Sequence, residues 1–197
     1  MKKFNDDSNV KPLNVKLKEM NIAVYCSSSN HIAENYKQSA YRLGEWIAES
    51  GNVLVFGGAT GGLMTAVSEG VANGKGQIVG VIPQAVIKMN RQSPLCSELI
   101  TVESMSERKA KMKEVADIFV VLPGSYGTLD EMFDVTASAI VGEHKKPLIV
   151  VNENGFYDDL LMLIARMRLE KFIPVENYKP VVVDNIDGCI TSLKSHC

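Results

Sequence analysis

The chain has 197 residues, enough for one domain with a buried core, and its hydrophobic fraction of 46% is ordinary for a globular protein. Its 21 basic and 23 acidic residues give a formal net charge of −2, which argues against a protein that binds nucleic acid through backbone charge alone. We therefore expect a small molecule as the ligand, with no nucleic acid or membrane partner.

The first segment, residues 1–20, carries Lys2 and Lys3 but no continuous apolar stretch behind them. It is predicted to be a loosely ordered arm, neither a secretory signal nor a membrane span, and residues 21–197 are predicted to form one domain. The cysteines form no Cys-x-x-Cys pair, so we expect no zinc or other metal site, and thiols in a cytoplasm rather than disulfides. They are Cys26, Cys96, Cys189 and Cys197.

Short β-branched runs alternate with amphipathic segments along the rest of the chain. Strands are expected at 22–26, 53–56, 78–82, 118–122, 148–151 and 181–183, with a weaker candidate at 99–102. Helices are expected at 34–50, 63–73, 105–115, 128–141 and 157–172, with a short one at 188–194. Most of the strands are apolar throughout, so both faces of the sheet must be covered. This pattern predicts an α/β fold, a Rossmann-like doubly wound parallel sheet of six to seven strands flanked by helices.

Three segments follow predicted strands and would meet at the carboxyl edge of the sheet, where ligands bind in open α/β folds. They are residues 27–29, 57–62 and 123–131. The connection at 84–97 is long and irregular, typical of a loop that closes over a ligand and equally of a plain surface loop.

The glycine loop at 57–62 precedes a helix, as a phosphate or ribose loop does. It is no Walker loop, because Leu63 and Met64 stand where lysine and a hydroxyl residue are required. It also lacks the dinucleotide fingerprint, having no acidic residue about twenty positions further on. Candidate ligand contacts around it are Ser27, Gly58, Thr60 and Gly61.

The turn at 123–131, Pro-Gly-Ser-Tyr-Gly-Thr-Leu-Asp-Glu, is the strongest candidate for an active site. Its glycines permit close approach of the backbone to a ligand, and the amides of the following helix favour a phosphate. The alternative is structural, since Thr128 and Glu131 also have the spacing of a capping box. Candidate phosphate contacts here are Gly124, Ser125, Tyr126, Gly127 and Thr128.

The helix expected at 105–115 begins with another candidate capping box, Ser104 and Glu107. Arg108, Lys109 and Lys111 follow in or near its first turn, where positive charge opposes the helix dipole unless an anion is bound. The alternative is a solvated basic face offset by local pairs such as Glu107 with Lys111. Arg108 is the sharpest candidate, because guanidinium binds phosphate and ribose oxygens with fixed geometry, and Lys109 is a further candidate contact.

If a nucleoside monophosphate binds on these elements, cleavage of its N-glycosidic bond needs few catalytic side chains. Glu131 would stabilise positive charge at C1′ and orient or deprotonate water, while Arg108 holds the sugar phosphate. Asp130 would point about 100° away from Glu131 on a helix, so it is predicted to be a dipole or surface residue.

These motifs together resemble the LONELY GUY (LOG) family, formerly mislabelled as lysine decarboxylases. Its motif Pro-Gly-Gly-x-Gly-Thr-x-x-Glu is similar to residues 123–131, and residues 24–28, 57–64, 105–112 and 146–172 resemble its other segments. The resemblance implies a phosphoribohydrolase that releases a free base and ribose 5-monophosphate from cytokinin riboside monophosphates, and sometimes from AMP. It also implies that Arg108 and Glu131 are the catalytic pair, that the protein is a homodimer or a larger homo-oligomer with the site near the subunit interface, and that no cofactor is needed.

The chain departs from the family pattern at six positions. Ser125, Ala59 and Thr65 replace glycines, Ser106 replaces a common histidine, and Ser138 and Ile140 stand where Trp and Gln are common. The first two are expected to alter the phosphate pose, and the last two the base pocket or its support.

Two other functions stay open. One is a nucleotide or cofactor carrier on the same architecture, related to the molybdenum-cofactor carriers, which would need no carboxylate beside the phosphate. The other, a single-stranded DNA binder, has less support because no aromatic and basic stripe is visible. Within the enzyme class, an AMP nucleosidase of purine salvage is the alternative to cytokinin activation.

Overall fold

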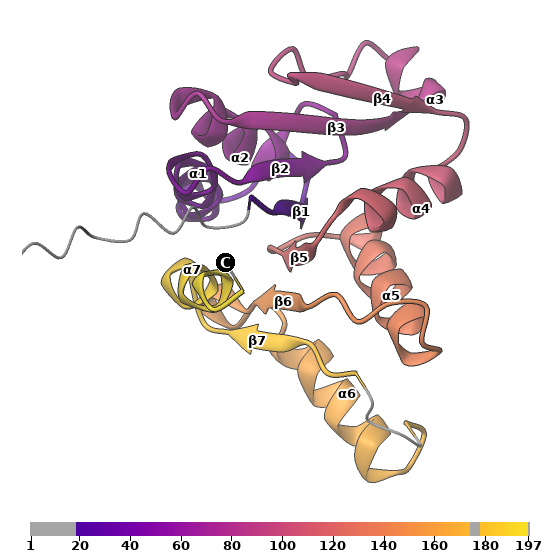
Figure 1. The fold of residues 1–197 in the computed structure, drawn as a ribbon. Helices are drawn as coiled ribbons and strands as arrows, with labels where there is room; N and C mark the ends of the chain where they lie inside the picture. Colours follow the sequence, from indigo (N-terminus) through magenta and orange to yellow (C-terminus); the bar gives the residue numbers. More distant parts are fainter. Residues whose placement is uncertain (1–18, 174–177, 197) are drawn as a thin grey trace, which may run out of the picture.

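The computed structural model describes residues 19–173 and 178–196, so the predicted arm lies almost entirely outside the described residues, as does Cys197. Seven parallel strands form one sheet in the order β4-β3-β2-β1-β5-β6-β7 (Figure 1). They are β1 (Asn21–Tyr25), β2 (Val53–Phe56), β3 (Gln77–Pro83), β4 (Glu98–Val102), β5 (Ile118–Val121), β6 (Leu148–Val151) and β7 (Val181–Val183). The predicted fold class is confirmed, as are the six strands and the weaker candidate, which is β4.

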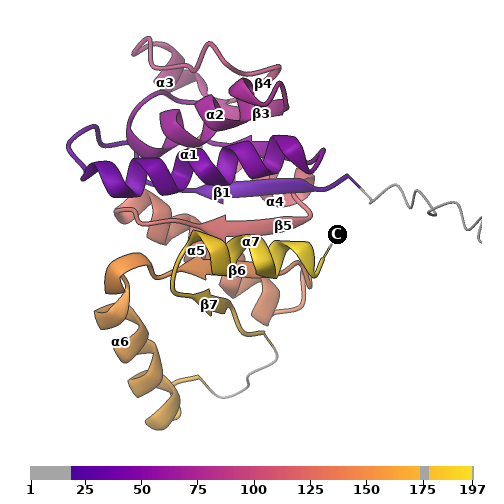
Figure 2. The same cartoon turned by 90° about the vertical axis from the view of Figure 1, so that its left-hand side faces the viewer.

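Helices cover both faces of the sheet: α1, α2 and α7 lie on one side and α4, α5 and α6 on the other (Figures 1 and 2). The helices are α1 (Glu34–Glu49), α2 (Gly62–Asn73), α3 (Gln84–Ile87), α4 (Met105–Val115), α5 (Tyr126–Ile140), α6 (Asp158–Leu169) and α7 (Ile186–Lys194). The short α3 lies in the connection expected to be irregular. None of the helices among the described residues is long and apolar enough to cross a membrane.

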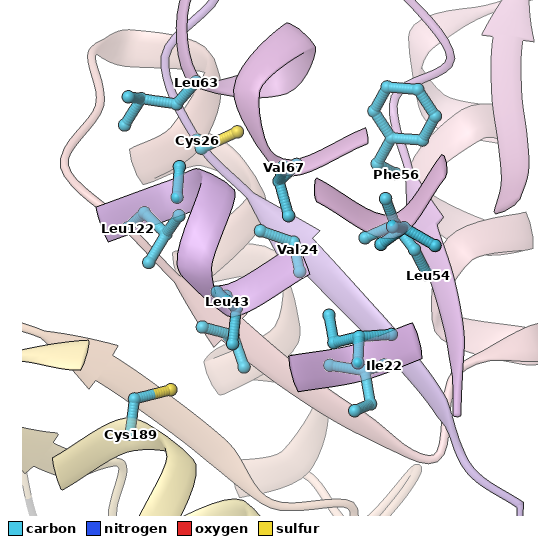
Figure 3. Packing of buried hydrophobic residues seen from close by; sticks show 14 of the residues in the cluster. Ile22, Val24, Cys26, Leu43, Leu54, Phe56, Leu63, Val67, Leu122 and Cys189 are labelled. Carbon is cyan, nitrogen blue, oxygen red and sulfur yellow. The ribbon is translucent and has the colours of Figure 1, made fainter. Parts of the chain in front are cut away.

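The core explains why the strands are apolar without alternation. Along β1, Ile22 and Val24 pack under α1 and α2 with Leu43 and Phe56, as Figure 3 shows. The intervening residues point to the opposite face; Tyr25 there joins a second cluster. Each strand in the middle of the sheet therefore contributes to two buried layers, as a sheet covered on both sides requires.

The strand order reverses at the centre of the sheet, and this reversal brings together the loops that carry the candidate site residues. The chain runs outward from β1 through β2 and β3 to β4, then returns to β5 on the other side of β1. The loops after β1 and β5 consequently meet, and Ser27 N–H donates to Pro123 O over 3.2 Å. Such a reversal point is where open α/β sheets bind their ligands.

Candidate active site

Two neighbouring helices bring Arg108 and Glu131 into direct contact. Arg108 lies in the first turn of α4 and Glu131 in the second turn of α5, and Arg108 Nη2 donates to Glu131 Oε1. Both residues are buried, with exposed fractions of 7% and 3%. A buried ion pair contributes little net stability, because both charges lose their hydration. Buried charged groups of this kind are common at functional sites, so the pair is a candidate for ligand chemistry.

One donor of the buried guanidinium is unused. Arg108 Nε has no hydrogen-bond partner among the described residues. Gly57 lies beside the same group, because a Cβ built on it would come within 3.4 Å of Arg108 Nη1. Burial lowers the pKa of Arg108, and the nearby Tyr25 hydroxyl opposes that shift. A buried, unpaired N–H is costly unless an oxygen acceptor meets it, so this atom indicates where an anionic or polar ligand would bind.

Ser104 caps the start of α4 as predicted, but Glu107 does not bond the residue that a capping box requires. Ser104 Oγ accepts from Glu107 N–H over 3.1 Å, while Glu107 Oε2 accepts from Glu103 N–H rather than from the N-cap residue. Of the local pairs that the alternative interpretation invoked, Glu107 with Lys111 is not formed; Lys111 Nζ instead lies 2.8 Å from Glu114 Oε1, which is also a local pair.

Lys109, predicted to contact the ligand, is paired at the rim of the site. Its Nζ lies 2.8 Å from Oδ1 of Asp130, which is half exposed, as expected for a surface residue. The basic start of α4 is thus partly neutralised by α5, and Arg108 is the cation that is buried there.

The start of α5 contradicts the alternative role of Glu131 as a helix cap. The helix begins at Tyr126, two residues before the predicted start, and its N-cap is Ser125, whose side chain makes no capping hydrogen bond. Thr128 is therefore inside the first turn, buried against Gly124, where a Cβ would lie 2.5 Å from Thr128 Cβ. Since no side chain caps α5 and residues 125–127 are exposed, its first amides face solvent. This open helix start is suited to bind an anion.

The glycine loop differs from the turn before α5. The amides at the start of α2 already have acceptors inside the protein. Gly61 N–H donates to Thr65 Oγ1 over 2.7 Å, and Gly62 N–H to Asn30 Oδ1 over 2.9 Å. The 84–97 connection is tied to the same loop, since Thr60 N–H donates to Arg91 O over 2.7 Å. Gly58, Thr60 and Gly61 are thus near the reversal point, and any contact between them and a ligand stays a prediction.

A hollow of about 740 Å³ adjoins this loop on the α1 and α2 side. It is lined by polar groups that include Asn30, Thr60 and Arg91, and by neither Arg108 nor Glu131. The buried pair and the start of α5 are therefore not part of this hollow.

Four departures from the family pattern have structural explanations. Ser125 has a φ of −107°, so no glycine is required there, and its side chain is exposed. Thr65 supplies the acceptor for Gly61. Ser138 Oγ donates to Asp134 O over 2.7 Å and lies 3.2 Å from Lys113 Nζ, so it supports the α4 and α5 contact. Ile140 lies on the outer side of α5, beside α6.

Tyr157 was not predicted to belong to the site. It directly precedes α6, is buried, and its hydroxyl donates over 2.8 Å to Leu122 O, just before the Pro123 turn. Its one sequence signal is its place a few residues after the carboxyl end of a predicted strand.

No cluster of three potential metal ligands occurs within residues 19–173 and 178–196.

The chain matches a family model described as "Possible lysine decarboxylase" over residues 64–193. A curated relative, "Cytokinin riboside 5'-monophosphate phosphoribohydrolase LOG" of Oryza sativa subsp. japonica, is 39% identical over 162 residues, covering 82% of this chain and 66% of the relative. "Cytokinin riboside 5'-monophosphate phosphoribohydrolase LOG7" of Arabidopsis thaliana is 38% identical over 152 residues, covering 77% of this chain and 70% of the relative. The aligned region thus spans about two thirds of the length of these relatives.

Solved structures share the fold. The molybdenum cofactor binding protein of Rippkaea orientalis superposes with a TM-score of 0.68 at 24% identity, covering 91% of this chain and 98% of that chain. The molybdenum cofactor carrier protein of Chlamydomonas reinhardtii gives 0.69 at 21% identity, covering 90% and 98%. At these identities the likeness concerns the architecture alone.

Proposed function

The chain belongs to the family of the curated phosphoribohydrolases that it matches, the LOG family, and we propose that it hydrolyses the N-glycosidic bond of a purine or cytokinin nucleoside 5′-monophosphate. The products are the free base and ribose 5-monophosphate. The observation that carries the proposal is the buried contact of Arg108 with Glu131 beside the uncapped start of α5. An anion site next to a buried carboxylate matches a phosphorylated substrate that develops positive charge as it reacts.

The phosphate binds at the start of α5, where the amides at Tyr126 and Gly127 meet it. Arg108 directs its unpaired Nε at an oxygen of the ribose phosphate. These contacts hold C1′ beside Glu131 and replace part of the hydration that the buried groups have lost.

In the reaction, a water oxygen forms a bond to C1′ while the bond from C1′ to the base nitrogen breaks. The bonding electron pair leaves with the base, which is then protonated at a ring nitrogen. Glu131 accepts a proton from the attacking water, and its negative charge stabilises the oxocarbenium character at C1′. Arg108 is the only side chain hydrogen-bonded to Glu131 in the described part of the chain, and this bond orients the carboxylate.

The structure gives no support to amine chemistry at this site. Two lysines of α4 are already paired with α5: Lys109 Nζ lies 2.8 Å from Asp130 Oδ1, and Lys113 Nζ lies 2.8 Å from Asp134 Oδ2. A Schiff base would need an amine that is free to react. The carrier alternative is opposed by Glu131, since a buried carboxylate beside an anion site weakens anion binding.

We also propose that a second copy of the chain covers α5 and α6. Apolar side chains are exposed along these helices, among them Phe133 at 45%, Met162 at 62% and Leu163 at 52%. Phe133 also lines a hollow of about 300 Å³ between the two helices. Such an apolar surface is typical of a homo-oligomer interface. A cytoplasmic location is part of the proposal, as the scattered cysteines indicated.

The deciding experiment incubates the purified protein with AMP, with isopentenyl-adenosine monophosphate and with the two dephosphorylated nucleosides, and detects free base by chromatography. Release from the monophosphates alone supports the proposal, and the preferred base separates cytokinin activation from an AMP nucleosidase. Binding of a monophosphate without any release would favour the carrier. Light scattering of Leu163→Glu tests the second copy, and a wild-type protein that is already monomeric would contradict it.

A further inference from the structure

Tyr157 is held rigidly between two elements of the sheet. Its N–H donates over 2.7 Å to Oδ1 of Asn152, the residue after β6, and Asn152 N–H donates over 2.8 Å to Val183 O in β7. Its ring meets Phe156 edge to face, with the centroids 4.9 Å apart. Only 3% of the surface of Tyr157 is exposed, so its ring is packed inside the protein.

That hydroxyl bridges the two ends of the turn that opens α5. It donates to Leu122 O over 2.8 Å and takes part in a hydrogen bond with the backbone of Gly124, whose N–H is the donor. Burial raises the pKa of Tyr157 well above its usual value, so the proton needed for the bond to Leu122 is always present. The residue between the two contacts is Pro123, whose carbonyl accepts from Ser27. Hydrogen bonds from Tyr157 and from Ser27 therefore both hold this turn in place.

We propose that the Tyr157 hydroxyl is a positioning group, which fixes the turn from Leu122 to Gly124 in the geometry that binds the phosphate of the substrate. The start of α5 depends on this tie, because Ser125 supplies no capping bond of its own. A displacement of the amides by a fraction of an ångström lengthens every hydrogen bond to a phosphate at once. The inference rests on the proposed function, in that the ligand at α5 is taken to be a phosphate ester.

Tyr157→Phe tests the proposal, with Tyr178→Phe as a matched control. Both hydroxyls donate to a backbone carbonyl, but Tyr178 bonds Lys146 O over 2.9 Å, away from the turn. Calorimetry measures the Kd of ribose 5-monophosphate, and base release from AMP gives kcat and KM. In Tyr157→Phe we expect Kd and KM to rise about tenfold with kcat changed less than about threefold, and in Tyr178→Phe all three to stay within about twofold.

Thermal unfolding shows whether both variants fold, and each is expected to unfold cooperatively. Unchanged affinity in Tyr157→Phe, equal weakening in both variants, or a wild-type protein that binds no ribose 5-monophosphate would each overturn the inference. A wild-type protein that binds this probe more tightly than Tyr157→Phe but releases no base would contradict the proposed hydrolysis and leave the positioning role supported.

Discussion

Glu131→Gln separates catalysis from structure, because glutamine keeps the shape of the side chain and removes its charge. The carboxylate is 3% exposed and its partner guanidinium 9%, so the pair is shielded from water. Removing one partner of such a pair leaves the other charge uncompensated, at a cost of about 3 kcal/mol to the free energy of unfolding. Domains of this size have about 5–15 kcal/mol in total, so the variant is expected to fold.

The effect on turnover should be larger than the effect on stability. Loss of the group that takes the water proton removes about 10²–10⁴-fold in kcat, and loss of its charge at C1′ adds to this. Binding should respond differently: with Glu131 neutral, Arg108 attracts the phosphate without competition, so the Kd of AMP stays the same or falls. The assays are chromatographic base release, calorimetry with AMP, and urea unfolding.

Asp130→Asn is the matched control, one residue away on the same helix. Its carboxylate is 53% exposed and bonds Lys109, so we expect turnover within about threefold of wild type and a change in stability below about 1 kcal/mol. Turnover near the wild-type rate in Glu131→Gln would refute the catalytic assignment. A fall in kcat of the same size in both variants would show that the charge of the α5 start, and not Glu131 itself, is what matters.

Three further predictions follow from the site and its surroundings. Arg108→Ala should weaken both turnover and the binding of AMP, since Arg108 bonds Glu131 and is proposed to contact the phosphate; calorimetry beside kinetics would detect a loss confined to one of them. Gly124→Ala should destabilise the fold by about 1–3 kcal/mol, because the added Cβ overlaps Thr128, whereas Gly127→Ala meets nothing within 4 Å and should not destabilise it; urea unfolding compares the two. Burial lowers the pKa of His144, whose Nε2 lies 3.1 Å from Val135 O, so below about pH 6.5 the unfolded chain binds more protons and stability should fall. His144→Gln should make that fall shallower, and a variant with the wild-type slope would contradict the assignment.

The sequence predicted the strands well because most are buried on both faces and carry uninterrupted apolar runs. The weak candidate, β4, lies at the edge of the sheet, where Leu99 and Thr101 are exposed, and this exposure is why its signal was weak. The start of α5 was wrong by two residues, because Gly124 and Gly127 indicated a longer turn. In the structure Gly127 is an exposed helical residue, and the turn ends at Ser125.

At the site, residue types indicated the chemistry of Arg108 and Glu131, but not their contact. The two side chains are 23 positions apart and meet only because α4 and α5 pack beside each other. The same limit applies to Tyr157, whose partners Leu122 and Gly124 come from another strand and turn. Local spacing predicts caps and helix faces, whereas contacts between elements depend on how the elements pack.

The pairing of Glu131 with Arg108 suits the proposed hydrolase better than a carrier, for an electrostatic reason. A carboxylate about 5 Å from a phosphate repels it by about 3 kcal/mol at an effective dielectric constant near 20, which lowers the affinity about a hundredfold unless a cation offsets the repulsion. Arg108 offsets that repulsion in the bound state, so substrate binding gains little from the pair as a whole. Once C1′ acquires positive charge, Glu131 attracts it and this attraction has no counterpart in the ground state. In the proposed reaction the pair therefore favours the transition state over the bound substrate, which is the requirement for catalysis and of no use to a protein that only stores its ligand.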